Sequence, residues 1–394
     1  MKHDVLVVGA GPSGLNAARI LAAKGLDVLV LEKKEEVGKH IICAGIVGEE
    51  AFRKFALSRD SILRNIQEIK IISPSSNMIS YQHPRPFAYV VDRELFDKHI
   101  SLGFANEVTR IETDSRVEDI VLNENSVEAL VTQNGNTQKK YTARVILIST
   151  GVNYNLHKKL GLGYPRDFLY GVQAELDLGP VDCTHVYLGR DIAAGAFAWL
   201  VPISPDTVRL GLITEKNPEA SFRRLMEMHF PVRLQKLDKT KIQYKPIAQG
   251  LMSKTYGERV LAIGEAAGQV KTTTGGGIYF GLLCSEIAAR VILKRFQEGI
   301  FSESRMAEYE KSWKKALQKE IRIGYYARKL CAKLTDSQIE SLFRVIQTDG
   351  FLPLVRERGN FDWHSDLLVQ LMKRLPLWQL LISRFKKEKH EVSI

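Results

Sequence analysis

A glycine-rich turn between a buried strand and a helix constrains this chain more than any other feature. Residues 4–8 form a short apolar, β-branched run that is typical of a buried parallel strand. The turn Gly9-x-Gly11-x-x-Gly14 then opens a helix, and a second β run over 27–31 ends at Glu32. In this order the glycines permit a tight turn, the approach of a pyrophosphate and close helix packing, while the acid binds ribose hydroxyls. The sequence therefore predicts a βαβ unit that binds the ADP part of a dinucleotide.

A second glycine-rich strand end decides which dinucleotide is expected. Near the other end of the chain, an expected buried strand over 258–263 ends at Gly264-Glu265, and Gly275-Gly276-Gly277 precede another helix. Two such sites far apart in sequence indicate one extended ligand that both of them hold. The Glu265 carboxylate can accept hydrogen bonds from ribityl hydroxyls, and the helix that starts near Gly277 points its positive end at a flavin ring. We therefore expect FAD rather than NAD.

Length, charge and cysteine content limit the class of protein. A chain of 394 residues, 45% of them apolar, predicts two or three folded domains. We find neither a signal peptide nor the roughly 20 apolar residues that a spanning helix needs, so we expect a cytoplasmic protein or one bound peripherally to the inner face of the cell membrane. Four cysteines without CxxC spacing indicate neither a metal site nor a disulfide framework. The net charge of +11 favours anionic partners or reflects a solvated helix face.

The order of the expected elements indicates a discontinuous domain with an inserted sheet. Runs that end at residue 148 have the pattern of a meander, residues 168–214 have that of an antiparallel sheet, and residues after 300 keep a helical stripe. The predicted fold is α/β, a Rossmann-like FAD-binding domain with an inserted antiparallel β-sheet substrate domain and a helical C-terminal region. The expected boundaries are 1–68, 88–165 and 255–300 for the FAD-binding domain, 69–87 and 166–254 for the substrate domain, and 301–394 for the helical region.

Further segments resemble one group of flavoproteins. The paired glycine motifs resemble FAD-dependent oxidoreductases of the p-hydroxybenzoate hydroxylase type, and within that group the chain is similar to the geranylgeranyl reductase family. The similarity covers about residues 1–330 and rests on Val91–Asp97 (DRxxFD), Tyr187–Gly189 with Gly195–Pro202 (YxWxFP), Ala262–Val270 with Thr274–Ile278 (GDAAG and TGGGI), and Cys43-Ala44-Gly45.

The chain also departs from the family pattern at several positions. Glu265 replaces an aspartate, Phe197 replaces a tyrosine, and Lys271-Thr272 stand where a proline is common nearby. Ser149-Thr150-Gly151 stand where hydroxylases carry Ala-Asp-Gly. The last difference weakens a monooxygenase interpretation.

The resemblance implies a set of site residues. Those implied to contact FAD are Gly9, Gly11, Pro12, Ser13, Gly14, Glu32, Lys33, Ala44, Gly45, Arg93, Val117, Gly264, Glu265, Gly275, Gly276, Gly277 and Ile278. The resemblance places Cys43 beside the flavin, where it could donate a proton or control access to the flavin face. The alternative is that Cys43 is simply a buried small side chain. Phe197, Trp199 and Pro202 are implied to be walls for a long apolar chain, with simple core packing as the alternative.

The implied activity is reduction of double bonds in a polyprenyl chain carried on a lipid, a diphosphate or a quinone. Hydride from the flavin must be matched by a proton at the other carbon, and electrons would come from NAD(P)H or a ferredoxin-like protein. The alternatives are a flavin-dependent monooxygenase or halogenase of the same fold, and an FAD-binding redox-responsive membrane- or partner-binding module. We expect no nucleic acid partner. Residues 371–389 combine Trp378, leucines and cations as an interfacial helix does, or they dock on the protein's own core.

Overall fold

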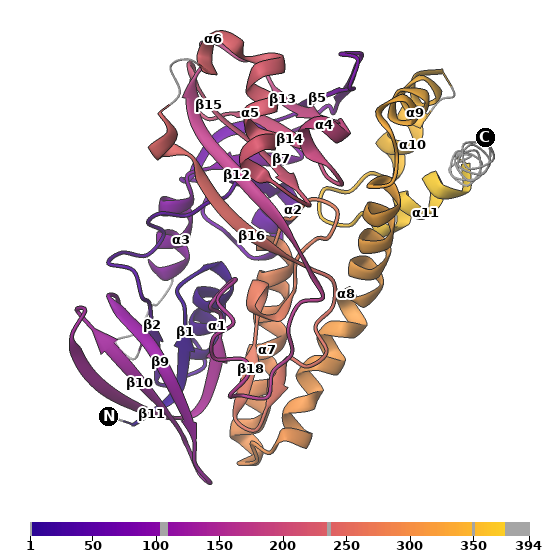
Figure 1. Ribbon diagram of the computed structural model, residues 1–394. Coiled ribbons are helices and arrows are strands. Elements are labelled where there is room, and N and C mark those ends of the chain that lie inside the picture. The colour runs from indigo at the N-terminus through magenta and orange to yellow at the C-terminus, as the bar shows by residue number, and fades with distance from the viewer. Residues whose placement is uncertain (1, 103–108, 235–237, 349–350, 375–394) are drawn as a thin grey trace, which may run out of the picture. The chain divides into compact units, whose positions relative to one another are not determined.

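The computed structural model describes residues 2–102, 109–234, 238–348 and 351–374 and divides into two compact units (Figure 1). Unit 1 comprises Met1–Leu63, Tyr89–Phe168 and Pro246–Arg322, and unit 2 comprises Arg64–Ala88, Leu169–Lys245 and Ile323–Ile394. No helix within the described ranges is long and apolar enough to cross a membrane. Most of the segment predicted to be an interfacial helix, from residue 375 onward, lies outside the described residues.

Unit 1 is built on a sheet whose central strands are parallel. Their order is β8-β2-β1-β11-β18, and β17 adds an antiparallel edge beside β18. The strands are β1 (Lys2–Val8), β2 (Val28–Leu31), β8 (Thr109–Glu112), β11 (Thr137–Ile148), β17 (Tyr256–Gly257) and β18 (Val260–Ala262). Strand β2 is buried at every residue, as a parallel strand covered on both faces must be.

Helices cover one face of this sheet and an antiparallel meander covers the other. Helix α1 (Pro12–Ala22) packs against α3 (Arg93–Leu102) and α7 (Ile278–Glu298). The meander consists of β9 (Ser115–Leu122), β10 (Val127–Gln133) and the first half of β11. Leu6 packs with meander residues, whereas its neighbour Val7 faces the glycine turn at Gly14. Side chains of β1 thus alternate between the two faces of the sheet, and an apolar layer forms on each face.

Smaller elements lie in unit 1, apart from residues 64–66 of β4 and residue 88 of β7, which belong to unit 2. A three-stranded sheet has the order β3-β7-β4. These elements are β3 (Ile46–Gly48), α2 (Glu49–Lys54), β4 (Ile62–Ile66), β7 (Ala88–Val91), the 3₁₀ turn η2 (Gly264–Ala267) and the first part of α8 (Glu303–Cys331).

Unit 2 is built on a seven-stranded, mainly antiparallel sheet in the order β16-β12-β15-β14-β13-β5-β6. The strands are β5 (Glu68–Ile72), β6 (Met78–Gln82), β12 (Asp167–Asp177), β13 (Thr184–Tyr187), β14 (Ala198–Pro202), β15 (Thr207–Thr214) and β16 (Gln243–Gln249). Residues 167–168 of β12 and 246–249 of β16 are assigned to unit 1. Leu200 and Leu210 on one face pack against Phe222 and Leu225 of helix α5 (Pro218–His229). The other helices here are α4 (Arg190–Ala193), α6 (Pro231–Leu234), the 3₁₀ turn η1 (Lys239–Lys241), α9 (Asp336–Thr348), α10 (Phe351–Arg358) and α11 (Ser365–Arg374).

The C-terminal helices of unit 2 are tied to the β5–β6 hairpin by polar contacts. The Glu340 carboxylate accepts hydrogen bonds from the Ser75 amide at 2.6 Å and from Asn77 Nδ2 at 3.0 Å. Gln347 Nε2 donates to the Met78 carbonyl at 3.3 Å. Parallel and antiparallel sheets followed by helices confirm the predicted fold class.

Candidate functional site

The three glycines of the first turn serve three different geometric needs. Gly9 has φ +105°, and a Cβ there would lie 2.5 Å from the Ser149 carbonyl oxygen. A Cβ on Gly14 would lie 2.2 Å from the Gly9 carbonyl oxygen. A Cβ on Gly11, in contrast, would meet nothing within 4 Å. Gly9 and Gly14 therefore keep the turn tight, whereas Gly11 leaves open space at the start of α1.

The start of helix α1 offers free backbone donors beside that space. Gly11 is the N-cap, no side chain caps the helix, and Pro12 occupies the first turn. The first N–H groups of a helix have no partner within it and carry the positive end of its dipole. This end of α1 therefore has the chemistry of an anion site.

Glu32 holds the glycine turn against the end of strand β2. Its Oε2 accepts from the Ala10 amide at 2.7 Å, and its Oε1 accepts from the Lys34 amide at 3.0 Å. The Glu32 side chain is buried, and the following Lys33 is exposed. A carboxylate oxygen accepts more than one hydrogen bond, so this bracing leaves acceptor capacity for a ribose. The sequence did not indicate the bracing role.

The late glycine motif lies directly against the first one. Gly264 has φ +66°, and a Cβ on it would lie 2.5 Å from Ser13 Oγ. A Cβ on Gly281 of α7 would lie 2.1 Å from the same oxygen. Asn16 Nδ2 of α1 donates to Ser285 Oγ of α7 at 2.7 Å. Two segments that are far apart in sequence thus meet at Ser13.

The triple-glycine segment forms a closed loop before helix α7. The Gly275 amide donates to the Lys271 carbonyl at 2.8 Å, and the Lys271 amide donates to the Gly276 carbonyl at 2.9 Å. Gly277 is the N-cap, and α7 begins at Ile278 without a side-chain cap. Glu265 is half-buried, and its Oε2 would lie 3.9 Å from a Cβ on Gly151. Helix α7 follows this loop directly, and the first N–H groups of the helix carry the positive end of its dipole, which suits a flat anionic ring.

Cys43 lies in contact with a buried ion pair. Arg93 Nη2 donates to both Asp97 carboxylate oxygens at 3.0 Å, and Asp97 is fully buried. Burial alone would lower the pKa of the Arg93 guanidinium, but the neighbouring Asp97 carboxylate and the Cys43 sulfur raise it above its usual value. The Gly45 carbonyl accepts from the Val91 amide at 2.8 Å, which fixes the segment Cys43-Ala44-Gly45 beside β7. The structure thus brings Cys43 and Arg93 together.

Val117 takes a different position from the glycine motifs. Its side chain packs against the apolar layer between the meander and the parallel sheet. Strand β9 begins beside Glu32, because the Ser115 amide donates to the Glu32 carbonyl at 2.8 Å. A contact between Val117 and the cofactor stays a prediction.

In unit 2 the predicted substrate residues separate into two groups. The rings of Phe197 and Trp199 are neighbours, with centroids 6.1 Å apart. Pro202 pairs with Val208 and alternates with Trp199, so it lies on the face that packs against α5. The structure therefore groups Phe197 with Trp199 but not with Pro202.

Trp199 also belongs to a row of three residues that the sequence did not reveal. Gln173 of β12 pairs with Gly211 of β15, which pairs with Trp199 of β14. A Cβ on Gly211 would lie 2.5 Å from Trp199 Cζ2, so the indole ring covers the glycine. Among the described residues, neither Trp199 Nε1 nor Gln173 Oε1 has a hydrogen-bond partner, although both atoms are buried.

Comparisons with known proteins agree with this architecture. The sequence matches the lycopene cyclase protein family over residues 4–348. Digeranylgeranylglycerophospholipid reductase 2 of Methanothermobacter thermautotrophicus is 27% identical, with 88% of this chain and 92% of the relative covered. The digeranylgeranylglycerophospholipid reductase of Methanocaldococcus jannaschii is also 27% identical, with 86% and 89% covered.

Solved structures share the fold. A geranylgeranyl bacteriochlorophyll reductase-like protein from Thermoplasma acidophilum has a TM-score of 0.82 at 21% identity, with 95% of this chain and 99% of that chain covered. The flavin-dependent brominase Bmp2 has a TM-score of 0.70 at 18% identity, with 95% and 99% covered. These findings confirm the predicted resemblance to FAD-dependent oxidoreductases of the geranylgeranyl reductase type. The chain belongs to the lycopene cyclase protein family, and its fold is that of FAD-dependent flavoproteins.

Proposed function

We propose that this protein is an FAD-dependent reductase that saturates carbon–carbon double bonds in the polyprenyl chains of a glycerophospholipid. The observation that carries the proposal is the meeting of the two glycine motifs at Ser13, which builds one site from both parts of the chain. The names of the relatives support the substrate class, since both describe reductases of a digeranylgeranyl glycerophospholipid.

The residues of unit 1 fit a flavin dinucleotide. The space beside Gly11 and the uncapped start of α1 suit a pyrophosphate, and Glu32 lies one strand away, where a ribose binds. The start of α7, which no side chain caps, offers the positive end of a helix dipole to a ring system. When bound, FAD supplies the hydride for one carbon of the double bond. The chain's own residues must then orient the lipid, exclude water and deliver a proton.

Cys43 is the proposed source of that proton. An isolated double bond carries no oxygen that could take up negative charge, so proton delivery at the second carbon is essential. The Cys43 sulfur contacts the Arg93 guanidinium, which Asp97 keeps charged. A guanidinium beside sulfur stabilises the thiolate that remains after the proton has left. Cys43 therefore has the neighbour that a thiol acid needs.

The Phe197–Trp199 face of unit 2 is the proposed lipid-binding surface. The two rings offer an apolar wall that suits an isoprenoid chain. Trp199 Nε1 is a donor and Gln173 Oε1 an acceptor, and leaving both buried without a partner is costly. A hydroxyl group or a water can accept a hydrogen bond from Trp199 Nε1 and donate one to Gln173 Oε1. We therefore propose that this row binds a hydroxyl or a water at the proposed lipid-binding surface.

Monooxygenase or halogenase chemistry is the alternative enzyme function. Structural neighbours with TM-scores of 0.70 include a flavin-dependent brominase and a p-nitrophenol 4-monooxygenase. In this chain Ser149 Oγ donates to the Gly9 carbonyl at 2.8 Å and to the Val8 carbonyl at 2.9 Å. Ser149 therefore braces the glycine turn and replaces part of the Ala-Asp-Gly segment of hydroxylases, which favours the reductase.

The test is a single-turnover reaction without oxygen. Protein with its FAD chemically reduced is mixed with a digeranylgeranyl glycerophospholipid, and the lipid is analysed by mass spectrometry. We expect the mass of two hydrogens to be added for each flavin oxidised. A lipid that stays unsaturated, together with hydroxylation or halogenation of an aromatic compound when oxygen is admitted, would support the alternative instead.

The electron donor and the membrane contact belong to the same proposal. NAD(P)H or a ferredoxin-like protein would reduce the flavin, and peripheral binding at the inner face of the cell membrane would give access to the lipid. Anaerobic mixing of the oxidised protein with each candidate donor identifies the one that reduces the flavin. Sedimentation with anionic vesicles at low and high salt tests the membrane contact. Salt screens the attraction between charges that lie more than a Debye length apart, which is about 8 Å at physiological salt, so binding by charge should weaken at high salt.

A further inference from the structure

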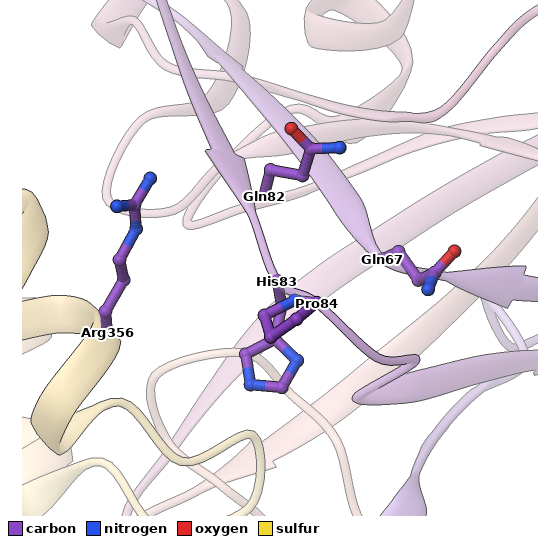
Figure 2. A pocket seen from close by; sticks show the side chains of 5 residues that line it. All are labelled: Gln67, Gln82, His83, Pro84 and Arg356. Carbon is purple, nitrogen blue, oxygen red and sulfur yellow. The ribbon is translucent and has the colours of Figure 1, made fainter.

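A polar hollow lies at the β6 edge of the unit 2 sheet. It has a volume of about 310 Å³ and is lined by Gln67, Gln82, His83, Pro84 and Arg356. Figure 2 shows the Arg356 side chain extending from helix α10 on one side and the other four side chains on the strand side. A volume of this size accommodates a small polar group, at the low end of the range of about 300–1,000 Å³ for ligand sites.

Apart from Pro84, the side chains that line this hollow carry hydrogen-bond donors, and none of the lining residues carries a carboxylate. Arg356 brings a guanidinium with five N–H donors, and the two glutamines bring amide groups. Glu68, which directly follows Gln67, is not among the lining residues, and its Oε1 accepts from Ser80 Oγ at 2.7 Å. A set of donors that contains a cation and lacks a carboxylate is complementary to an oxyanion.

Arg356 also differs from its neighbour Arg358 in its partners. Arg358 pairs with Glu357 at 3.1 Å and with Asp366 at 3.7 Å. Within the part of the chain that the structure describes, Arg356 makes no ion pair or hydrogen bond through its side chain. Its exposed guanidinium is therefore available to an external anion, and a guanidinium binds phosphate with two parallel hydrogen bonds.

Contacts of the flanking segments hold the two sides of the hollow together. Helix α9, which precedes α10, is bound to the β5–β6 hairpin through Glu340 and Gln347. The ring of Phe361, which follows α10, lies 6.2 Å from that of Phe87, centroid to centroid. On the strand side, the His83 amide donates to the Gln67 carbonyl at 2.8 Å, and a His83 ring nitrogen donates to the Arg85 carbonyl at 2.6 Å. The site is thus built from fixed elements on both sides.

We propose that this hollow is a phosphate-binding site in which Arg356 supplies the charge and Gln67, Gln82 and His83 supply further hydrogen-bonding groups. Its ligand is a phosphate mono- or diester, which is either the headgroup phosphate of the lipid substrate or a free phosphate compound. The headgroup version rests on the proposed function, whereas phosphate binding itself does not.

The first arm of the test measures phosphate binding by full-length holoprotein. Inorganic phosphate and glycerol phosphate are titrated against the protein by calorimetry, with chloride at equal ionic strength as the reference. We expect saturable binding that Arg356→Gln weakens about tenfold, the loss expected for a hydrogen-bonded charge. The matched control Arg358→Gln, on the same helix, should bind as the unchanged protein does. Absence of saturable binding, or equal loss in both variants, overturns the proposal.

The second arm separates the two sources of phosphate. Lipid reduction is followed with the digeranylgeranyl glycerophospholipid and with the same lipid lacking its phosphate headgroup. If the headgroup is the ligand, Arg356→Gln raises KM about tenfold for the phospholipid only and leaves kcat unchanged. If Arg356→Gln alters phosphate binding but neither KM, a free phosphate compound is the ligand. If no lipid is reduced at all, the proposed function fails and the first arm still decides phosphate binding.

Discussion

The Ser13 hydroxyl occupies the space that a side chain on Gly281 would need, since a Cβ there would lie 2.1 Å from Ser13 Oγ. Ser13 belongs to the first helix and Gly281 to α7, so this contact joins the two halves of the proposed flavin site. Gly281 is the fourth residue of this 21-residue helix, and a glycine within a helix otherwise costs helix stability. Close approach of the two helices explains why a glycine is used there.

Gly281→Ala should therefore destabilise the protein through a steric clash. We expect a loss of about 1–3 kcal/mol in the free energy of unfolding, measured by urea denaturation of the apoprotein. Ser13→Ala removes the clashing oxygen, after which the new Cβ would lie 3.4 Å from the Ser13 Cβ, an ordinary contact. The double variant should recover most of the loss. Additive losses in the double variant would show that the contact is not the cause.

Gly11→Ala should leave the fold intact and reduce FAD binding. A Cβ on Gly11 meets nothing within 4 Å, and its φ of −82° and ψ of 174° suit alanine. The open space is the proposed pyrophosphate position, so the new methyl group should weaken FAD binding at least tenfold. Thermal unfolding of the apoprotein and fluorescence titration with FAD provide the two measurements. Unchanged FAD affinity would place the pyrophosphate elsewhere.

The fold class and the paired glycine motifs could be predicted because they depend on local patterns. The glycines fall between an apolar run and a helical stripe, and each pattern is contained in a few neighbouring residues. Roles that depend on contacts between distant segments could not be predicted. The bracing of the turn by Glu32 and Ser149 and the row from Gln173 to Trp199 arise from strand pairing, which the sequence does not specify.

Pro202 shows the same limit within a single strand. The motif alone groups Pro202 with Phe197 and Trp199, because a motif takes no account of the alternation of side chains between the two faces of a strand. Strand β14 places Trp199, whose ring neighbours that of Phe197, on one face and Pro202 on the other. In a regular strand every second side chain points to the same face, so Pro202, three residues after Trp199, lies on the opposite face from Trp199. A glutamine within the apolar run of β12 was the available signal for Gln173.

His157 should make stability depend on pH. Burial lowers its pKa, with an opposing effect from the hydrogen bond to Ala266, whose carbonyl accepts from His157 Nε2 at 2.8 Å. The unfolded chain takes up a proton near the ordinary pKa of about 6.5, while the folded chain resists it. The free energy of unfolding should therefore fall as pH decreases below about 6.5, by up to about 1.4 kcal/mol per pH unit for this group. His157→Gln keeps an N–H donor but does not titrate, so urea unfolding between pH 5 and pH 8 should show a smaller slope. An unchanged slope would assign the dependence to other groups.

Cys43→Ala should retain FAD and lose most double-bond reduction. Loss of a proton donor lowers the rate by about 10²–10⁴-fold. The measurement is reoxidation of the reduced variant by the lipid in a single turnover, with the flavin spectrum as the check on FAD binding. Cys331→Ala is the matched control, because Cys331 is exposed on helix α8 in unit 2. Equal rates in the two variants would assign Cys43 a packing role.

Gln173→Leu should separate stability from lipid binding. Gln173 Oε1 is buried without a partner in the described structure, and replacing such a group by an apolar one of similar size removes a desolvation cost. The free energy of unfolding should therefore stay equal or rise by about 1 kcal/mol. If Gln173 and Trp199 bind a hydroxyl or a water beside the lipid, the same variant should raise KM for the lipid about tenfold. Trp199→Phe keeps an aromatic wall but removes the indole donor, so it should raise KM in the same direction. A Gln173→Leu protein that is less stable, with an unchanged KM, would mean that the amide has a structural partner and that this face does not bind the substrate.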